Sequence, residues 1–179
     1  LEKDGPTVVE IPPGIGPGTV DDAFFRFVID MGAPGPDKGN GGKYLILPPG
    51  YKGEPPAGYS VGRSTSYVNL LVLRGFLVDG KPDAAATTFK SVKIYPFAKA
   101  DSLPTMQYIN GSKRAFNTIH ANTEAFYEEV SHVLQKEPVD FIDPELRGLA
   151  AGIGLRKGKP FAPDARMKVI LVESAAVAN

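Results

Sequence analysis

The chain has no cysteine, and this absence excludes three kinds of chemistry at once. Without Cys among its 179 residues, it has no disulfides, no thiol nucleophile and no thiolate metal site. Its histidines are His120 and His132, and a typical zinc site built on two histidines needs carboxylates from elsewhere. No Asp/Asn spacing matches a calcium loop. We therefore expect no metal and no cofactor.

The chain also lacks an excess of charge of either sign. Lys+Arg 20 balance Asp+Glu 20, so the formal net charge is zero. The absence of any basic block argues against a nucleic-acid partner and against a polybasic membrane anchor. The longest apolar run, residues 70–78, is interrupted by Arg74 and Gly75. It is far shorter than the ~20 residues of a transmembrane helix, so we expect no transmembrane segment.

Glycine and proline, in contrast, are abundant. Gly 20 and Pro 17 together make 37 of 179 residues, well above the usual ~12%. They concentrate in the first hundred residues without forming a repeat, which indicates turns between short strands rather than disorder. The densest stretch is residues 34–59. Because Gly supplies positive φ and Pro fixes φ near −65°, this stretch predicts a loop with a specific path.

Within that stretch, Gly39–Lys43 (GNGGK) resembles a phosphate-binding loop but fails its spacing. Asp37 stands where the first glycine is required, and Tyr44 stands where Ser or Thr would bind magnesium. The segment also precedes a strand, so no helix N-terminus faces a phosphate. We therefore predict an ordered loop over residues 37–43 that binds no nucleotide.

The first half of the chain has the patterns of β-strands. Short apolar or alternating runs predict strands over residues 7–11, 22–30, 43–47, 59–64, 67–79 and 92–96, with a short helix over 82–89. The segment 67–79 is apolar on both faces, which predicts a buried strand bulged at Arg74-Gly75. Asn110-Gly111 is the strongest two-residue hairpin signal, so strands are predicted over 105–109 and 112–116.

From residue 122 onward the pattern becomes helical. Phe126, Val130, Val133 and Leu134 form an amphipathic stripe that ends at Pro138. Two further helices are predicted to begin near residues 143 and 164 and to bring the total to three. Strands followed by helices predict an α+β fold. We expect a β-rich module over residues 1–98 and a hairpin plus three helices over 99–179.

Three arginines lie in predicted strands among apolar neighbours: Arg26, Arg63 and Arg74. Burying a charge without a partner costs roughly several kcal/mol of folding free energy. The favoured interpretation of these arginines is therefore a structural ion-pair network. The natural partners are Asp22, Asp30 and Asp79. For Arg74 in particular, the sequence predicts a buried anchor paired to Asp79 or Asp30.

The alternative for these arginines is a pocket that offers guanidinium to an anionic or hydroxyl-rich ligand, with tyrosine at its wall. On that interpretation the candidate ligand-binding residues are Arg63, Arg74, Asp30 and Tyr44, with Tyr59 and Tyr67 as further tyrosines. The weak catalytic candidate is His120, the one ready acid-base group. His120 precedes a helix N-terminus, where a turn or cap role is favoured over catalysis.

Six segments, in this order, resemble the DUF1254 family (domain of unknown function 1254) over nearly the whole chain. They are DDAFFR (residues 21–26), GPDKGNGGKY (35–44), LPPGYKG (47–53), RGFLVDG (74–80), FNTIH (116–120) and KPFAPDARM (159–167). Family members are mostly bacterial, with relatives in large viruses, and are often exported. The resemblance implies a jelly-roll β-sandwich, followed in the whole protein by a second domain, DUF1214. It also implies that this chain lacks the start of the module and that second domain.

The chain departs from the family at Ala23-Phe24-Phe25, where relatives commonly have a tryptophan. This departure weakens the argument that an aromatic platform binds sugars. No catalytic residues are established for the family, so none can be assigned to this chain by resemblance. We expect a non-catalytic module of an exported, periplasmic or secreted bacterial protein. It would bind a small polar ligand such as a sugar, or act in assembly as a homo-oligomer. The alternative is a hydrolase-like enzyme that combines His120, an acid such as Asp30 and groups from the further domain.

Overall fold

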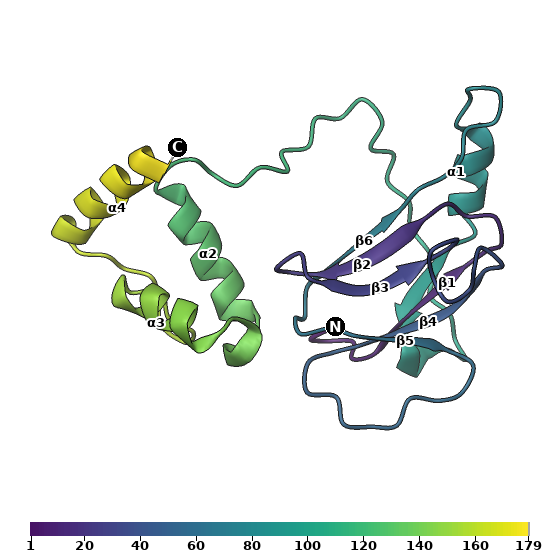
Figure 1. The fold of residues 1–179 in the computed structure, drawn as a ribbon, viewed down its shortest axis with the longest axis horizontal. Helices are drawn as coiled ribbons and strands as arrows, with labels where there is room; N and C mark the ends of the chain where they lie inside the picture. Colours follow the sequence, from purple (N-terminus) through teal and green to yellow (C-terminus); the bar gives the residue numbers. More distant parts are fainter. Residues whose placement is uncertain (179) are drawn as a thin grey trace. The chain divides into compact units, whose positions relative to one another are not determined.

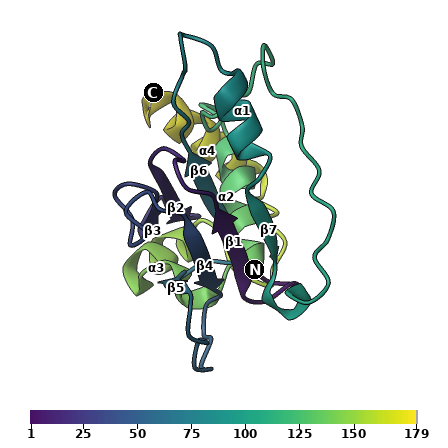
Figure 2. The same ribbon diagram turned by 90° about the vertical axis from the view of Figure 1, so that its right-hand side faces the viewer.

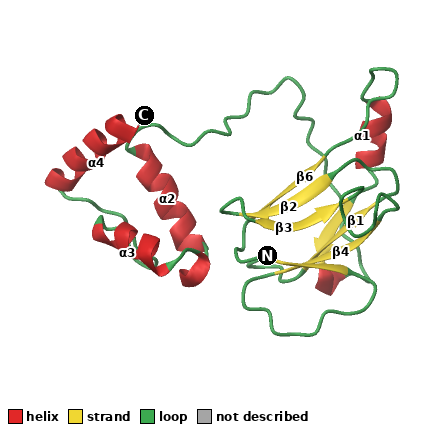
Figure 3. Ribbon diagram, viewed as in Figure 1, coloured by secondary structure: helices red, strands yellow, loops and turns green. Residues whose placement is uncertain are grey.

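The computed structural model describes residues 1–178. The chain divides into two compact units, the first Leu1–Ile109 and the second from Asn110 onward. The strands and α1 belong to the first unit and the other α-helices to the second, as Figures 1 and 3 show. The strands are β1 (Thr7–Ile11), β2 (Gly18–Asp22), β3 (Phe27–Met31), β4 (Gly42–Leu47), β5 (Ser60–Arg63), β6 (Asn69–Leu73) and β7 (Lys93–Pro96). The α-helices are α1 (Asp83–Phe89), α2 (Ala125–Lys136), α3 (Pro144–Gly152) and α4 (Ala165–Ala178). Short 3-10 turns, η1 (Phe97–Lys99) and η2 (Val139–Phe141), follow β7 and α2.

The strands form two sheets, both visible in Figure 2. One has four strands in the order β5-β4-β1-β7, and the other has three in the order β3-β2-β6. Every pairing is antiparallel except that of β4 with β5. The α+β class, with a β module followed by helices, is confirmed. The jelly-roll connectivity implied by the resemblance stays a prediction.

The main core lies between the two sheets. Residues of a strand alternate between its two faces, and the residues on the inner face of each sheet form this core. Its buried residues from the four-stranded sheet are Val9, Ile11, Tyr44 and Ile46, and those from the three-stranded sheet are Val20, Ile29 and Met31. Gly62 of β5 faces this core, and a Cβ there would lie 2.9 Å from the Cγ2 of Ile29. The sheets therefore pack closely at the β5 side.

A second apolar cluster covers the outer face of the four-stranded sheet. Val8, Leu45, Leu47 and Tyr95 are buried there under Tyr51, Tyr59, Phe97 and their neighbours. The proline-rich loop after β4 thus has a packing role. At the edge of this cluster the Tyr95 hydroxyl donates to Glu10 Oε1 at 2.5 Å, and Lys43 Nζ lies 3.1 Å from the same oxygen.

The second unit holds the three predicted helices, and its residues cap their ends. Asp143 Oδ1 accepts from Leu146 N at 2.9 Å at the start of α3, as the N-cap signal predicts. Lys157 Nζ donates to Gln135 O at 2.8 Å and to Glu137 O at 2.7 Å at the end of α2. A cation beside these carbonyls satisfies acceptors that the helix cannot. No helix in the described residues is long and apolar enough to cross a membrane.

The predicted hairpin over residues 105–116 is wrong, because this segment contains no strand. A type I′ turn needs positive φ at both central residues, but positive φ falls on Lys113 instead. Asn110 Oδ1 accepts from Ser112 N at 2.9 Å, which starts a turn one step further along. Before it, the Tyr108 hydroxyl donates to Lys90 O at 2.7 Å and ties this segment to the β module.

Two strand predictions are also wrong in their extent. Residues 22–30 were predicted as one strand, but residues 23–26 form the turn between β2 and β3, and the second half of the segment belongs to β3. The turn forms because the Asp22 carboxylate accepts hydrogen bonds from the backbone of Phe24 and Arg26. Residues 67–79 were predicted as a buried strand, but only β6 is extended, and it lies at the edge of its sheet. The chain leaves the sheet at Arg74, whose N–H donates to Pro17 O at 3.0 Å.

Candidate functional site

Tyr44, a predicted ligand-binding residue, is part of the core. It is fully buried, and its hydroxyl donates to Asp37 Oδ1. Burial and this hydrogen bond raise the pKa of the Tyr44 phenol well above its ordinary value of 10.0. The hydroxyl is thereby held protonated and committed to Asp37, which assigns Tyr44 a structural role.

The glycine-rich loop before β4 folds around that same carboxylate. Asp37 Oδ1 accepts from Gly32 N at 2.8 Å, and its Oδ2 accepts from Gly41 N at 3.1 Å. Gly41 has φ +76, and a Cβ there would lie 2.7 Å from Pro13 N, so only glycine fits. Two amides that could bind a phosphate thus already bind a carboxylate of the chain itself. The absence of nucleotide binding by this loop stays a prediction.

Asp22 organises the turn between β2 and β3. It is only 3% exposed and accepts from Phe24 N, Arg26 N, Arg26 Nε and Thr65 Oγ1 at 2.6–2.9 Å. Burial alone would raise the pKa of Asp22, but these hydrogen bonds outweigh it and hold the pKa below the ordinary 3.8. The predicted pairing of an arginine with Asp22 is therefore confirmed for Arg26. The turn also places Phe25 at φ 55, a strained angle for a large residue.

Further predicted ligand residues are Arg63 and Asp30, and no hydrogen bond or ion pair joins them among residues 1–178. Arg63 is exposed at the end of β5, where its Nη1 donates to Tyr51 O at 3.4 Å. Asp30 lies half-buried in β3, opposite Thr19. Neither lines any of the pockets described below.

The prediction that Arg74 is a buried anchor is wrong. It is exposed rather than buried, and no carboxylate of the described residues forms an ion pair with it. The reason is that the segment 67–79 does not form a central strand, so the arginine lies just beyond the edge strand β6 and reaches water.

His120 belongs to the second unit, whereas Asp30 belongs to the first. Its Nδ1 lies 3.1 Å from Ala121 O, and its ring packs edge-on against Phe126 with centroids 5.2 Å apart. It lines a pocket of about 180 Å³ with Thr123 and Tyr127. Among residues 1–178 no carboxylate hydrogen-bonds to its ring, so its surroundings favour a local structural role.

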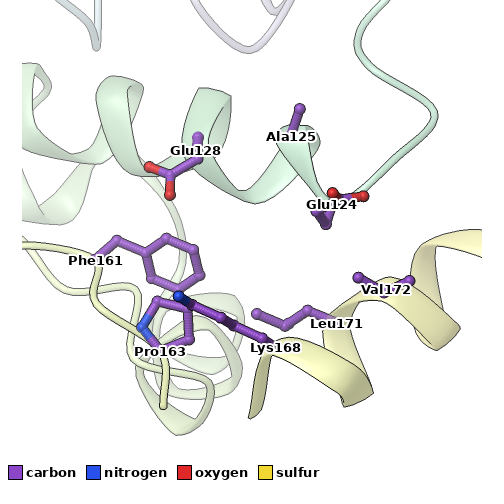
Figure 4. Close-up of a pocket in the computed structure, with 8 residues that line it drawn as sticks. All are labelled: Glu124, Ala125, Glu128, Phe161, Pro163, Lys168, Leu171 and Val172. Carbon is purple, nitrogen blue, oxygen red and sulfur yellow. The ribbon is translucent and has the colours of Figure 1, made fainter. Parts of the chain in front are cut away.

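The second unit also contains a pocket of about 420 Å³, shown in Figure 4. Its lining comes from α2, α4 and the segment before α4: Glu124, Ala125, Glu128, Phe161, Pro163, Lys168, Leu171 and Val172. Of these residues Leu171 is buried, whereas the two glutamates, Lys168 and Val172 are exposed. The pocket therefore opens to solvent and has a charged rim.

A further candidate lies between the two sheets of the first unit, on the side of β6 and β7, and is open to solvent. This pocket has a volume of about 350 Å³, within the ~300–1,000 Å³ range of ligand sites. Its lining residues are Leu1, Thr7, Val9, Val20, Ile46, Tyr67, Val68, Asn69, Leu71 and Ile94. Val9, Val20 and Ile46 are core residues, so the inner wall is rigid and apolar. We call this space the inter-sheet pocket.

One polar side chain of the inter-sheet pocket has an unusual hydrogen-bonding state. Asn69 Nδ2 donates to Ser66 O at 3.1 Å and to Tyr67 O at 3.4 Å. Its Oδ1 is buried and, within residues 1–178, is the one buried side-chain nitrogen or oxygen without a hydrogen-bond partner. Flipping the amide would place its oxygen against two carbonyl oxygens, which is unfavourable. The two hydrogen bonds from Nδ2 therefore fix the orientation of the amide and leave Oδ1 as the atom without a partner.

Sequence reasoning missed this pocket. Leu71 and Asn69 alternate with the exposed Leu70 and Val72, and this alternation was the available signal for a half-buried edge strand. The apolar content of residues 67–79 concealed it. Val20 was missed because β2 lies in a segment rich in Gly and Asp that gave no strand pattern of its own.

Comparison with known proteins extends these observations. The model of a family described as protein of unknown function (DUF1254) matches residues 1–96, a range that includes every residue lining the inter-sheet pocket. A search of curated proteins found no match. The fold is similar to the crystal structure of the VPA0106 protein from Vibrio parahaemolyticus, with a TM-score of 0.64 and 17% identity. That similarity covers 97% of this chain and 43% of that one, so the chain spans less than half of that protein's length. With its match over more than half of its residues, the chain belongs to the DUF1254 family.

Proposed function

We propose that this chain is a non-catalytic binding module that holds a small, largely apolar molecule in the inter-sheet pocket. The observation that carries the proposal is the pocket itself. It lies inside the family-matched module, and its inner wall is formed by buried aliphatic side chains from both sheets, Val9 and Ile46 from one and Val20 from the other. Such a wall recognises a ligand through removal of apolar surface from water.

The lining supports an apolar ligand over the sugar expected from the sequence. A sugar needs several polar partners, because each buried hydroxyl without a hydrogen bond costs free energy. Apart from backbone groups and the Tyr67 hydroxyl, the polar side chains of the lining are Thr7 and Asn69. Enzyme chemistry has less support, since His120 contacts its own backbone and an aromatic ring.

The proposal is tested by calorimetry with n-hexanol as the probe. We expect saturable binding with one site per chain and a negative heat-capacity change, the mark of buried apolar surface. Leu71→Trp fills the pocket and should abolish binding. The matched control is Leu70→Trp, since Leu70 is the neighbouring residue on the opposite face of β6 and is 44% exposed.

Binding that survives Leu71→Trp, or that is lost equally in both folded variants, would contradict the proposal. Glucose titrated in parallel decides between the apolar ligand and the sugar. Saturable glucose binding that Leu71→Trp removes would assign the pocket to a polar ligand instead.

A second candidate function is assembly with a second copy of this chain, and β6 is the feature that favours it. β6 lies at the edge of its sheet and contains no charged residue and no proline, whereas edge strands are usually protected by such residues. Antiparallel pairing of β6 across a twofold axis would join two three-stranded sheets. Sedimentation should show a dimer that Val72→Lys dissociates and that Val177→Lys, an exposed change in α4, leaves intact. A monomer at all concentrations would exclude this mode.

A further inference from the structure

We infer that Asn110, where the second unit begins, is a site of spontaneous deamidation that adds one negative charge to the chain. The chain contains two Asn-Gly pairs, Asn40-Gly41 and Asn110-Gly111, and both asparagines are exposed. A glycine after asparagine favours this reaction, because no Cβ hinders the attacking amide. From the sequence alone the two pairs should react alike, whereas the structure separates them. This inference does not depend on the inter-sheet pocket.

The reaction begins when the backbone nitrogen of Gly111 attacks Cγ of Asn110. The Gly111 N–H proton passes to solvent, the new N–Cγ bond forms and the Cγ–Nδ2 bond breaks. The departing nitrogen takes up a proton from solvent and leaves as ammonia. Water then opens the resulting succinimide ring at one of its carbonyls, which leaves aspartate or isoaspartate at position 110. Water is thus the one co-reactant, and no oxidant or reductant takes part.

The carboxamide of Asn110 is turned forward along the chain. Its Oδ1 accepts from Ser112 N at 2.9 Å, so the carboxamide is held beside the Gly111 peptide that contains the attacking nitrogen. A donor on this oxygen also stabilises the negative charge that develops on it during the attack. Within residues 1–178, Gly111 N donates no hydrogen bond, so the nucleophile is available. The segment also contains no strand or helix that would hold its backbone in place.

The carboxamide of Asn40 is turned the other way. Its Nδ2 donates to Asp37 O at 3.1 Å, three residues earlier in the chain. Gly41 N, which would be the attacking nitrogen, donates to Asp37 Oδ2 at 3.1 Å. Gly41 is also closely packed, since a Cβ there would lie 2.7 Å from Pro13 N. Attack at Asn40 therefore requires two hydrogen bonds to break inside a tightly packed loop, which raises the barrier.

The test is prolonged incubation of the full chain at neutral pH, followed by peptide mapping with mass spectrometry, which detects the change from amide to acid at each asparagine. We expect Asn110 to convert at least about tenfold faster than Asn40, a difference of about 1.4 kcal/mol in activation free energy. Equal rates at the two sites, or faster conversion of Asn40, would overturn the inference.

The same incubation in urea tests whether the fold causes the difference. Unfolding removes both arrangements, so the two rates should approach each other. If the same ratio of rates persisted in the unfolded chain, the local sequence would be its cause and the structural inference would be wrong.

The role of the forward hydrogen bond is tested with Ser112→Pro, which removes the N–H that Asn110 Oδ1 accepts. This variant should convert Asn110 about fivefold more slowly, the effect of one hydrogen bond made to the transition state. Ser112→Ala is the matched control, because it keeps the N–H and should leave the rate unchanged. An unchanged rate in Ser112→Pro, or an equal loss in both variants, would contradict the assigned role of this hydrogen bond.

Discussion

Asp22 and Arg26 are joined by a hydrogen-bonded ion pair, with Arg26 Nε 2.7 Å from Asp22 Oδ2 across the turn between β2 and β3. The arginine side chain is 45% exposed, whereas the aspartate side chain is 2% exposed. The same carboxylate binds two backbone amides and the hydroxyl of Thr65. The pair is therefore the visible part of a buried anion site that shapes the turn.

Asp22→Asn should reduce the free energy of unfolding by about 2–3 kcal/mol, because the buried carboxylate accepts several hydrogen bonds as a charged group. Urea denaturation at neutral pH measures the change. The control is Asp21→Asn, a half-exposed neighbour whose hydrogen bond from Thr19 is long at 3.5 Å. That variant should remain within about 0.5 kcal/mol of the wild-type chain. Equal effects of the two substitutions would show that Asp22 does not organise the turn.

Asp37→Asn should loosen the glycine-rich loop, since the amides of Gly32 and Gly41 lose a charged acceptor. Hydrogen exchange at these two amides is the measurement, and faster exchange there than at β1 amides is the expected result. Tyr44→Phe removes one donor to the same carboxylate and should destabilise the chain by only about 1 kcal/mol. Unchanged exchange at both glycines in Asp37→Asn would contradict the assigned role of the carboxylate.

Glu10 should make the stability of the β module dependent on pH. The hydrogen bond from Tyr95 lowers the pKa of Glu10 below 4.5, with further lowering by Lys43 and Lys93. A carboxyl whose folded pKa is depressed stabilises the fold above its unfolded pKa, and this stabilisation is lost as pH falls through the folded pKa. Glu10→Gln should therefore cost about 1 kcal/mol at pH 7 and progressively less below pH ~4.5.

Urea denaturation of both proteins across that pH range checks this expectation. Glu54→Gln, at an exposed position in the loop before β5, is the control and should leave the pH dependence unchanged. A difference between Glu10→Gln and the wild-type chain that grows toward low pH would have the wrong sign and would disprove the assignment.

The sequence predicted the elements whose patterns are local. β1 has the predicted bounds, 7–11, and β4, β5, β7, α1 and the three later helices lie within a few residues of their predicted positions. Alternation, proline positions and N-cap residues act within a few residues of the chain, so they are readable without the fold.

The errors arose where contacts between residues distant in the sequence determine the local structure or the burial of a side chain. The Asp22 carboxylate that shapes the turn also accepts from Thr65, and Tyr108 of the predicted hairpin donates instead to Lys90 O. Both partners are distant in the sequence. Arg74 was predicted to be buried because its neighbours are apolar, but an edge strand leaves such residues in water. The inter-sheet pocket could not be predicted for the same reason. It requires β2 and β6, which the sequence patterns did not place as neighbours.

The most direct test of the central claim is a methyl NMR titration of the isotope-labelled chain with n-hexanol. We predict saturable shift changes at the pocket methyls of Val9, Val20, Ile46, Leu71 and Ile94. The methyls of Val8 and Leu45, adjacent in sequence but on the opposite face of the same sheet, should remain unchanged. Changes confined to Leu171 and Val172 of the helical unit, or spread equally over both faces of the sheet, would contradict the claim that the inter-sheet pocket is the binding site.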